Sequence, residues 1–138
     1  SVAFKRNRDE YYRRLSAVRT EGDWESWTAF FAECIRTAAD DGVATAQAIF
    51  ARLNADRQAL LRCRGLTIPA IRLFDRLPSQ PIVTLARVMA GVKTTKPTAA
   101  KAIDALRRAR ILTEITGKRR DRVYAYHGYL QILTKDTE

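Results

Sequence analysis

A proline-containing break at residues 77–81 (Leu-Pro-Ser-Gln-Pro) divides the chain and constrains how it folds more than any other feature. Proline lacks the backbone N–H and disfavours helical geometry in the preceding residue, so two prolines this close together stop a helix. Apolar residues recur at helical spacing before the break, whereas after it two helical stretches lead into two segments typical of strands. The sequence therefore predicts a mainly α-helical chain with two units, residues 1–78 and 79–138.

The positive charge is concentrated after this break. The 138 residues have a formal net charge of +10, and residues 79–138 contribute +7 of it, with 12 Lys and Arg against 5 Asp and Glu. Such an excess favours an anionic partner, usually nucleic acid, although a basic surface that binds nothing specific is about equally common. No apolar run approaches the length that spans a bilayer, and two cysteines are too few for a disulfide framework or a Cys-x-x-Cys site. We therefore expect a cytoplasmic protein without membrane contact, metal or cofactor.

The first unit is predicted to contain several helices. Phe4, Tyr11, Leu15 and Val18 share one helix face, and Gly22 ends that helix. Asp23 can cap the next helix, which carries a broad aromatic face. The residues of this face are Trp24, Trp27, Phe31, Cys34, Ile35 and Ala38. We interpret the face as core, which another domain could cover, rather than as a ligand platform.

Further along the first unit, the Asp-Asp-Gly segment at residues 40–42 favours a kink or break. Helical spacing returns from Ala44 to about Arg64, and Pro69 suits the first turn of another short helix. Cys34 and Cys63 have no histidine nearby in the sequence, so we expect two buried free thiols.

The second unit has the pattern of a winged helix-turn-helix domain. A short helix over residues 85–91, capped by Thr84, leads through a turn at 92–94 into a second helix from Thr95 to about Arg110. Strands are predicted at 113–116 and 122–126 around a turn that begins at Gly117, and a short helix follows. In this motif the second helix enters the major groove of DNA, while the wing contacts phosphate or the minor groove.

This arrangement identifies two sets of candidate DNA-binding residues. With Ile103 at the centre of the buried face, Ala99, Ala100 and Leu106 point inward. The predicted outer face consists of Pro97, Thr98, Lys101, Asp104, Ala105 and Arg108. The helix candidates are Thr94, Thr95, Lys96, Thr98, Lys101 and Arg108, and the wing candidates are Lys118, Arg119, Arg120 and Arg122. Both sets could instead be solvated faces, and winged helices also serve in protein recognition and dimerisation.

Several segments of the chain resemble one family of known proteins. The first segments are residues 7–15 (NRDEYYRRL), 18–27 (VRTEGDWESW) and the pair Phe30-Phe31. They are similar to the segment just after the catalytic motif of Fic (filamentation induced by cAMP)/Doc proteins. Residues 93–103 (KTTKPTAAKAI), the Arg-Ile-Leu of 110–112 and residues 116–122 (TGKRRDR) resemble the winged helix that ends many members. The resemblance implies that residues 1–78 are C-terminal helices of a Fic-like domain and that residues 79–138 are the winged helix-turn-helix domain.

Members of that family typically transfer AMP from ATP to a protein hydroxyl, using an HPFxxGNGR-type motif that this sequence lacks. His127 is followed by Gly-Tyr-Leu, so no catalytic residue can be carried over, and we expect no enzyme activity from this chain. The resemblance implies a DNA-binding, transcription-regulatory module of a protein adenylyltransferase. The alternative is a winged helix that recognises a protein or dimerises the parent. The implied partners are double-stranded DNA, a missing N-terminal Fic core, and a second copy that covers the Trp24, Trp27 and Phe31 face.

Overall fold

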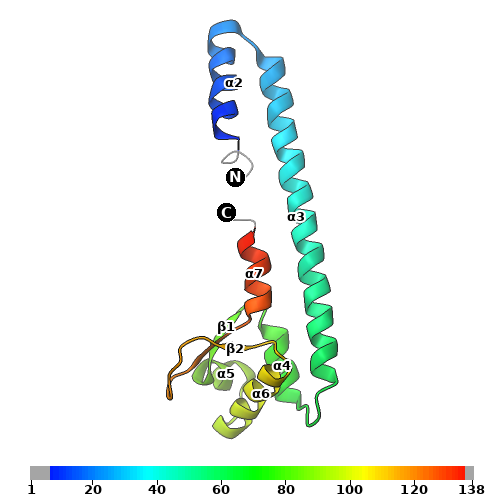
Figure 1. The fold of residues 1–138 in the computed structure, drawn as a ribbon, viewed down its shortest axis with the longest axis vertical. Coiled ribbons are helices and arrows are strands. Elements are labelled where there is room, and N and C mark those ends of the chain that lie inside the picture. The colour runs from blue at the N-terminus through cyan, green and yellow to red at the C-terminus, as the bar shows by residue number, and fades with distance from the viewer. Residues whose placement is uncertain (1–6, 136–138) are drawn as a thin grey trace. The chain divides into compact units, whose positions relative to one another are not determined.

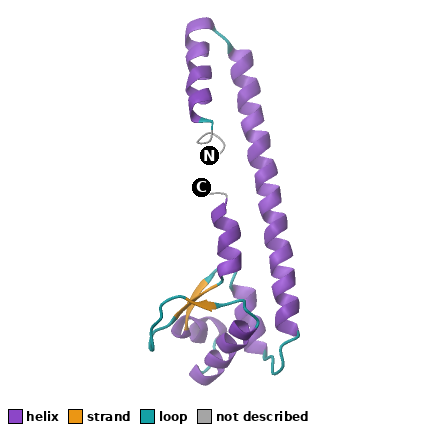
Figure 2. Ribbon diagram, viewed as in Figure 1, coloured by secondary structure: helices purple, strands orange, loops and turns teal. Residues whose placement is uncertain are grey.

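The computed structural model describes residues 7–135, which are mainly helical with one small antiparallel sheet (Figures 1 and 2). This confirms the predicted mainly α-helical class. In chain order the elements are α2 (Arg8–Glu21), α3 (Trp24–Leu61), α4 (Ile68–Arg76), β1 (Ile82–Thr84), α5 (Leu85–Val92), α6 (Lys96–Arg108), β2 (Thr113–Glu114), β3 (Val123–Ala125) and α7 (His127–Lys135). Among these described residues, no helix is both long and apolar enough to cross a membrane.

Contacts divide the chain into two units at residues 48 and 49, rather than at the predicted residues 78 and 79. The first unit comprises residues 1–48 and 134–138, and the second comprises residues 49–133. The end of α3 and all of α4 therefore belong with the elements that follow the prolines. The physical reason is burial, because Leu60, Leu73 and Leu77 enter the same apolar cluster as Val83 and Leu106. The proline segment ends a helix without separating two cores.

In the first unit, α2 ends and α3 begins as the sequence predicts. Gly22 has a left-handed φ of 70°, and the Asp23 carboxylate accepts a hydrogen bond from the Ser26 N–H at 3.1 Å. The rings of Tyr11 and Trp27 meet edge to face, with centroids 5.4 Å apart. Phe4, which the sequence places on the inner face of α2, lies outside the described residues.

Within the described residues, most of the aromatic face of α3 is exposed, so its interpretation as core requires another domain or a second copy to cover it. Trp24 is 63% exposed, Phe31 43% and Ile35 53%, whereas Cys34 is buried. Within the described part of this unit, α2 contacts α3 at Trp27, and a single neighbouring helix cannot bury so broad a face. Cys63 is half-buried, so only one of the two free thiols is buried as expected.

The predicted kink or break at residues 40–42 is also wrong, because α3 continues through this segment. An interior glycine costs a helix about 1 kcal/mol relative to alanine, which makes the segment unfavourable but does not block it sterically. The side chains of Asp40 and Asp41 are exposed, and Asp40 forms an ion pair with Arg36 at 3.4 Å. The helix therefore passes this segment without burying an unpaired charge.

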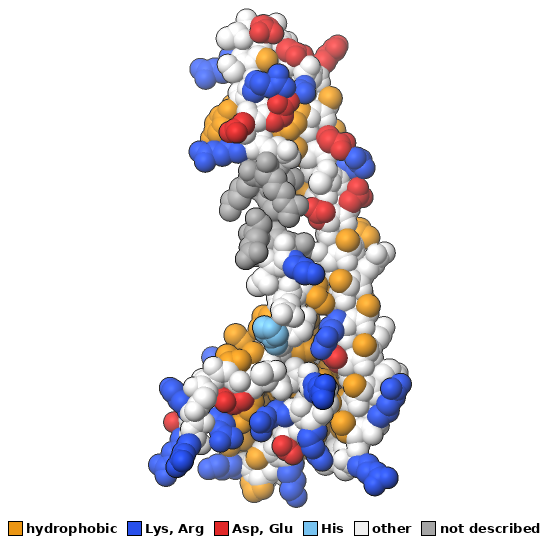
Figure 3. Space-filling model, viewed as in Figure 1, with side chains coloured by type: hydrophobic (Ala, Val, Ile, Leu, Met, Phe, Trp, Pro, Cys, Tyr) orange, Lys and Arg blue, Asp and Glu red, His pale blue; other side chains and the backbone are white. Residues whose placement is uncertain are grey.

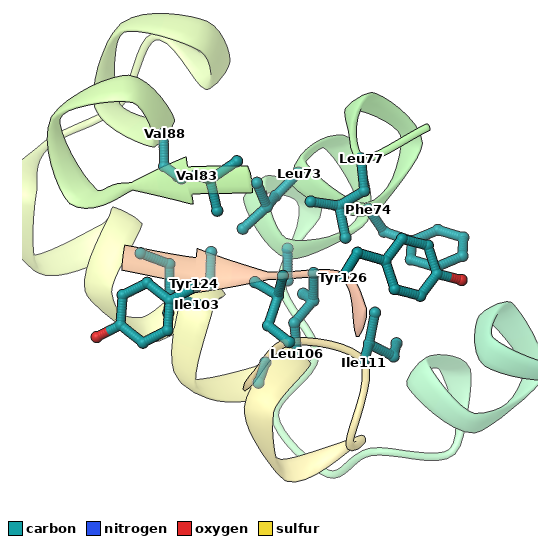
Figure 4. Packing of buried hydrophobic residues seen from close by; sticks show 14 of the residues in the cluster. Leu73, Phe74, Leu77, Val83, Val88, Ile103, Leu106, Ile111, Tyr124 and Tyr126 are labelled. Atoms are coloured by element: carbon teal, nitrogen blue, oxygen red, sulfur yellow. The ribbon is translucent and has the colours of Figure 1, made fainter. Parts of the chain in front are cut away.

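The core of the second unit forms where α4, α5 and α6 pack together beside the sheet (Figure 4). Pro69 lies in the first turn of α4, and this helix buries Leu73 and Phe74. Burying side chains of this size contributes about 2 kcal/mol each. In the sheet, β3 lies between β1 and β2, and Tyr124 of β3 is opposite Val83 on one side and Glu114 on the other. The sequence predicted the β2–β3 hairpin, with longer strands, but not the pairing of β1.

Helices α5 and α6 follow the predicted order, with differences in detail. The Thr84 hydroxyl caps α5 by accepting a hydrogen bond from the Arg87 N–H at 3.3 Å. Thr95 occupies the N-cap position of α6, but its hydroxyl lies 3.0 Å from the Thr98 hydroxyl and makes no cap hydrogen bond. The predicted faces of α6 are wrong at two positions, since Ala100 is exposed and Ala105 is buried. Because α6 packs against both α4 and α5, its buried face is wider than a single contact would make it.

Candidate nucleic-acid interface

A groove of about 770 Å³ lies between the first turns of α5 and α6 and the loop that joins β2 to β3. We call it the basic groove. Its lining residues are Thr84, Leu85, Ala86, Lys96, Arg119, Arg120, Asp121, Arg122 and Tyr124. Four of the ten predicted DNA-binding residues are among them: Lys96 from the helix, and Arg119, Arg120 and Arg122 from the wing. The fold thus brings the two sets of candidates to one concave surface.

We call the segment between β2 and β3, which the sequence predicts to be a wing, the wing loop, and its start is held by the side chain of Glu114 at the end of β2. Its carboxylate accepts hydrogen bonds from the N–H of Thr116 at 2.7 Å, the N–H of Gly117 at 3.0 Å, and the Thr116 hydroxyl. These bonds, led by the one from the Thr116 hydroxyl, hold the pKa of Glu114 below its usual range. Gly117 adopts the predicted positive φ of 64°. A carboxylate with several donors is a strong anchor for a turn, so the wing starts from a defined position.

The wing loop is also closed at its other end. The Nε of Arg122 donates a hydrogen bond to the backbone carbonyl of Lys118 at 2.8 Å. Asp121 has a positive φ of 52°, a conformation that aspartate tolerates better than most residues. Arg119 and Arg120 lie between these two points and are exposed. The loop therefore presents two guanidinium groups at the wing tip.

The cations of this region are largely unneutralised. Among the described residues, none of Lys96, Lys101, Arg119 and Arg120 forms an ion pair with a carboxylate, and all four are exposed. Asp121 is the one acidic residue that lines the basic groove. Figure 3 shows basic side chains gathered over the hairpin and the helices beside it. A concave surface with this charge attracts polyanions.

No family model matches the chain, and no curated protein sequence matches it. The resemblance to the Fic family, and the description of the first helices as part of a Fic-like domain, remain predictions. Among the described residues there is also no group of three or more His, Cys, Asp or Glu side chains that could hold a metal ion.

The remaining predicted residues do not line the basic groove. Lys101 is exposed on α6, beyond the first turn, and Thr98 is half-buried beside Thr95. Arg108 lies about 18 Å along the helix from Lys96, and it forms an ion pair with Asp104 at 3.4 Å. This pairing reduces the charge that Arg108 can offer to an anion. The other predicted residues outside the groove are Thr94, Thr95 and Lys118.

The start of α5 and Tyr124 also belong to this surface, although the sequence did not predict them there. Thr84, the last residue of β1, and Leu85 and Ala86 after it come close to the β2–β3 loop because β1 pairs with β3. Tyr124 lies on β3, and the guanidinium of Arg107 is 5.9 Å from its ring centre. A strand of three residues has too weak a sequence signal to predict this pairing. The side of the groove formed by α5 was therefore not predictable from local pattern.

Proposed function

We propose that the second unit is a winged helix-turn-helix domain that binds double-stranded DNA. The order α4, β1, α5, α6, β2, β3 supports this, because α5 and α6 form consecutive helices and the hairpin that follows them corresponds to the wing. The three-residue connection between α5 and α6, residues 93–95, is short enough to keep the two helices packed together. In this assignment α6 is the recognition helix.

The observation that carries the proposal is the basic groove, in which Lys96 at the start of α6 and three wing arginines line one surface. A duplex seated on α6 would place its phosphates within reach of these cations. The first N–H groups of α6 add to this attraction, since helix N-termini favour anions. Lys101 would face the base edges or the neighbouring backbone, while Arg119 and Arg120 would contact phosphate or the minor groove.

The salt dependence of binding gives the proposal a quantitative form. If Lys96, Lys101, Arg119, Arg120 and Arg122 each neutralise a phosphate, the slope of log K against log salt is about −4 to −5. Most of the affinity for a random sequence would come from these contacts. The affinity should therefore fall steeply between low and physiological salt.

Fluorescence anisotropy with a random duplex of about 20 base pairs tests the proposal. We expect wild-type protein to bind at ~50 mM salt, and we expect Arg119→Ala with Arg120→Ala to weaken binding and flatten the salt slope by about 2. Arg62→Ala with Arg64→Ala is the matched control, since both residues are exposed, lie outside the basic groove and make the same change in charge. Absent binding at low salt, or equal effects of the two double variants, would overturn the proposal.

We further propose that this domain is the non-catalytic, regulatory end of a Fic-family protein. The resemblance of residues 7–31 and 93–122 supports this assignment. An HPFxxGNGR-type motif in the sequence upstream of Ser1 would support it, and its absence from that sequence would count against it. If the domain instead recognises a protein, substitutions on the exposed face of α6 should remove a protein partner in a pull-down and leave the duplex titration unchanged.

A further inference from the structure

A second basic depression, of about 290 Å³, lies in the second unit outside the basic groove. We call it the α4 hollow. Its lining residues are Arg72, Asp75 and Arg76 of α4, and Gly91, Val92 and Lys93 at the end of α5. It thus carries three cations and one carboxylate. None of its residues was singled out as a site by the sequence pattern.

The carboxylate in the α4 hollow is already engaged. Asp75 forms an ion pair with Arg57 of α3, which is not a lining residue. Among the described residues, Arg72, Arg76 and Lys93 form no ion pair with a carboxylate, and their side chains are exposed. Three cations therefore share a concave surface with little compensating charge.

One of these cations, Arg76, lies against Gly91 of α5. A Cβ added to Gly91 would lie 3.0 Å from the Nε of Arg76 and 3.3 Å from its Cζ, so the guanidinium lies directly against the helix backbone. The carbonyl end of α5 carries about half a negative charge, which accounts for one nearby cation. This partial charge does not account for the two further cations, Arg72 and Lys93. Their excess positive charge suits an anion with several acceptor oxygens, such as a phosphate.

The position of Lys93 connects the α4 hollow to the proposed DNA surface. Lys93 directly follows α5, and α6 begins three residues later at Lys96, which lines the basic groove. Three residues of chain span at most about 10 Å. A duplex with phosphates at the start of α6 would therefore continue close to Lys93. This continuity favours a phosphate of the same duplex over an unrelated anion.

We propose that the α4 hollow binds a phosphate of the DNA backbone and so extends the interface from the basic groove across the turn to α4. This inference rests on the proposed DNA binding. Arg72 and Arg76 supply charge-assisted hydrogen bonds to the phosphate oxygens, and Lys93 supplies a further positive charge. Because a phosphate contact carries no sequence information, the α4 hollow positions the duplex and strengthens binding equally for all sequences.

The double variant Arg72→Gln with Arg76→Gln tests the proposal, because glutamine keeps a long polar side chain beside Gly91 and removes the charge. In anisotropy titrations with the random duplex, we expect affinity to fall roughly 10-fold at ~0.1 M salt and the salt slope to flatten by about 2. Arg72→Lys with Arg76→Lys should retain most of the affinity. The charge-matched control is Arg62→Gln with Arg64→Gln, and circular dichroism confirms that each variant is folded.

The outcomes separate this inference from the proposed function. Suppose that wild-type protein binds the duplex and Arg119→Ala with Arg120→Ala weakens binding, but Arg72→Gln with Arg76→Gln behaves like its control. That result would overturn only the proposed phosphate contact of the α4 hollow and leave the proposed DNA binding standing. If wild-type protein does not bind the duplex, both fail. A titration with inorganic phosphate, followed by the NMR amide signals of Gly91 and Lys93, distinguishes the source of the anion. If phosphate shifts these signals but Arg72→Gln with Arg76→Gln leaves the duplex affinity unchanged, the site binds free phosphate and the proposed DNA contact is overturned.

Discussion

A buried hydrogen bond between Tyr126 and Asp56 joins the end of the sheet to α3. The Tyr126 hydroxyl donates to Oδ2 of Asp56 at 2.6 Å, and the Nε of Arg52 donates to the same oxygen at 2.6 Å. Tyr126 is fully buried and Asp56 is 7% exposed. Burial, together with the hydrogen bond to Asp56, raises the pKa of the Tyr126 phenol far above its usual value. The carboxylate accepts hydrogen bonds from two donors, which offset part of the cost of its burial.

We expect Tyr126→Phe to lower the free energy of unfolding at pH 7 by about 1 to 2 kcal/mol through loss of this hydrogen bond. Folding holds the phenol neutral, so its contribution is complete below the unfolded pKa near 10 and is lost as the pH rises toward the folded pKa. The difference between wild type and Tyr126→Phe should therefore shrink by about 1 kcal/mol between pH 7 and pH 11. Urea unfolding followed by circular dichroism at both pH values measures it. A difference that stays constant with pH would contradict the assignment.

At the scale of elements, α3 is a continuous helix through residues 40–42, although the local sequence pattern predicts a kink or break there. Gly42 has a helical φ, and a Cβ added to it would meet no atom within 4 Å. Gly22, between α2 and α3, has a φ of 70° and equally open surroundings. The two glycines therefore differ in backbone conformation, whereas the space around each would admit a Cβ. Only Gly22 uses the conformational freedom that glycine has.

We expect opposite effects of alanine at these two positions. Gly42→Ala should raise the free energy of unfolding by about 0.5 to 1 kcal/mol, because alanine favours the helix and restricts the unfolded chain. Gly22→Ala should lower it by about 1 kcal/mol, because a Cβ disfavours the left-handed conformation. Chemical denaturation monitored by helical circular dichroism compares the two variants, and destabilisation by Gly42→Ala would show that the continuous helix is wrong.

At the scale of the whole molecule, the two units carry different kinds of surface. In the second unit, Lys and Arg side chains gather around the basic groove and the α4 hollow. In the first unit, the aromatic face of α3 leaves Trp24, Phe31 and Ile35 substantially exposed. Exposed apolar side chains concentrated on one helix face favour association with another protein surface. The predicted second copy of this chain is one such surface.

We expect the isolated chain to self-associate through this face in the micromolar range. Trp24→Ser with Ile35→Ser should shift sedimentation toward the monomer by removing apolar contact area. The matched control is Ile68→Ser with Ile115→Ser, since both isoleucines are exposed and lie in the second unit. Analytical ultracentrifugation measures the distribution. A wild-type chain that sediments as a monomer across this concentration range would contradict the expectation.

Local signals in the sequence were enough to predict the helical class, the order of α5, α6 and the hairpin, and the caps at Asp23 and Thr84. Helix capping, proline geometry and the positive φ of Gly22 and Gly117 depend on neighbouring residues, so they can be predicted without the fold. The same local signals identified the basic residues of α6 and the wing. Four of these residues then proved to line one groove.

Tertiary packing alone decided the division at residues 48 and 49, the pairing of β1 with β3, the buried face of α6 and the network around Asp56. Each depends on residues distant in sequence, as with Tyr126 and Asp56, which are 70 positions apart. Periodicity shows that a helix has an apolar face, but it does not show which neighbour covers that face or how widely. For that reason the sequence by itself determined which cations this protein has available, while only the fold decided which of them share a concave surface.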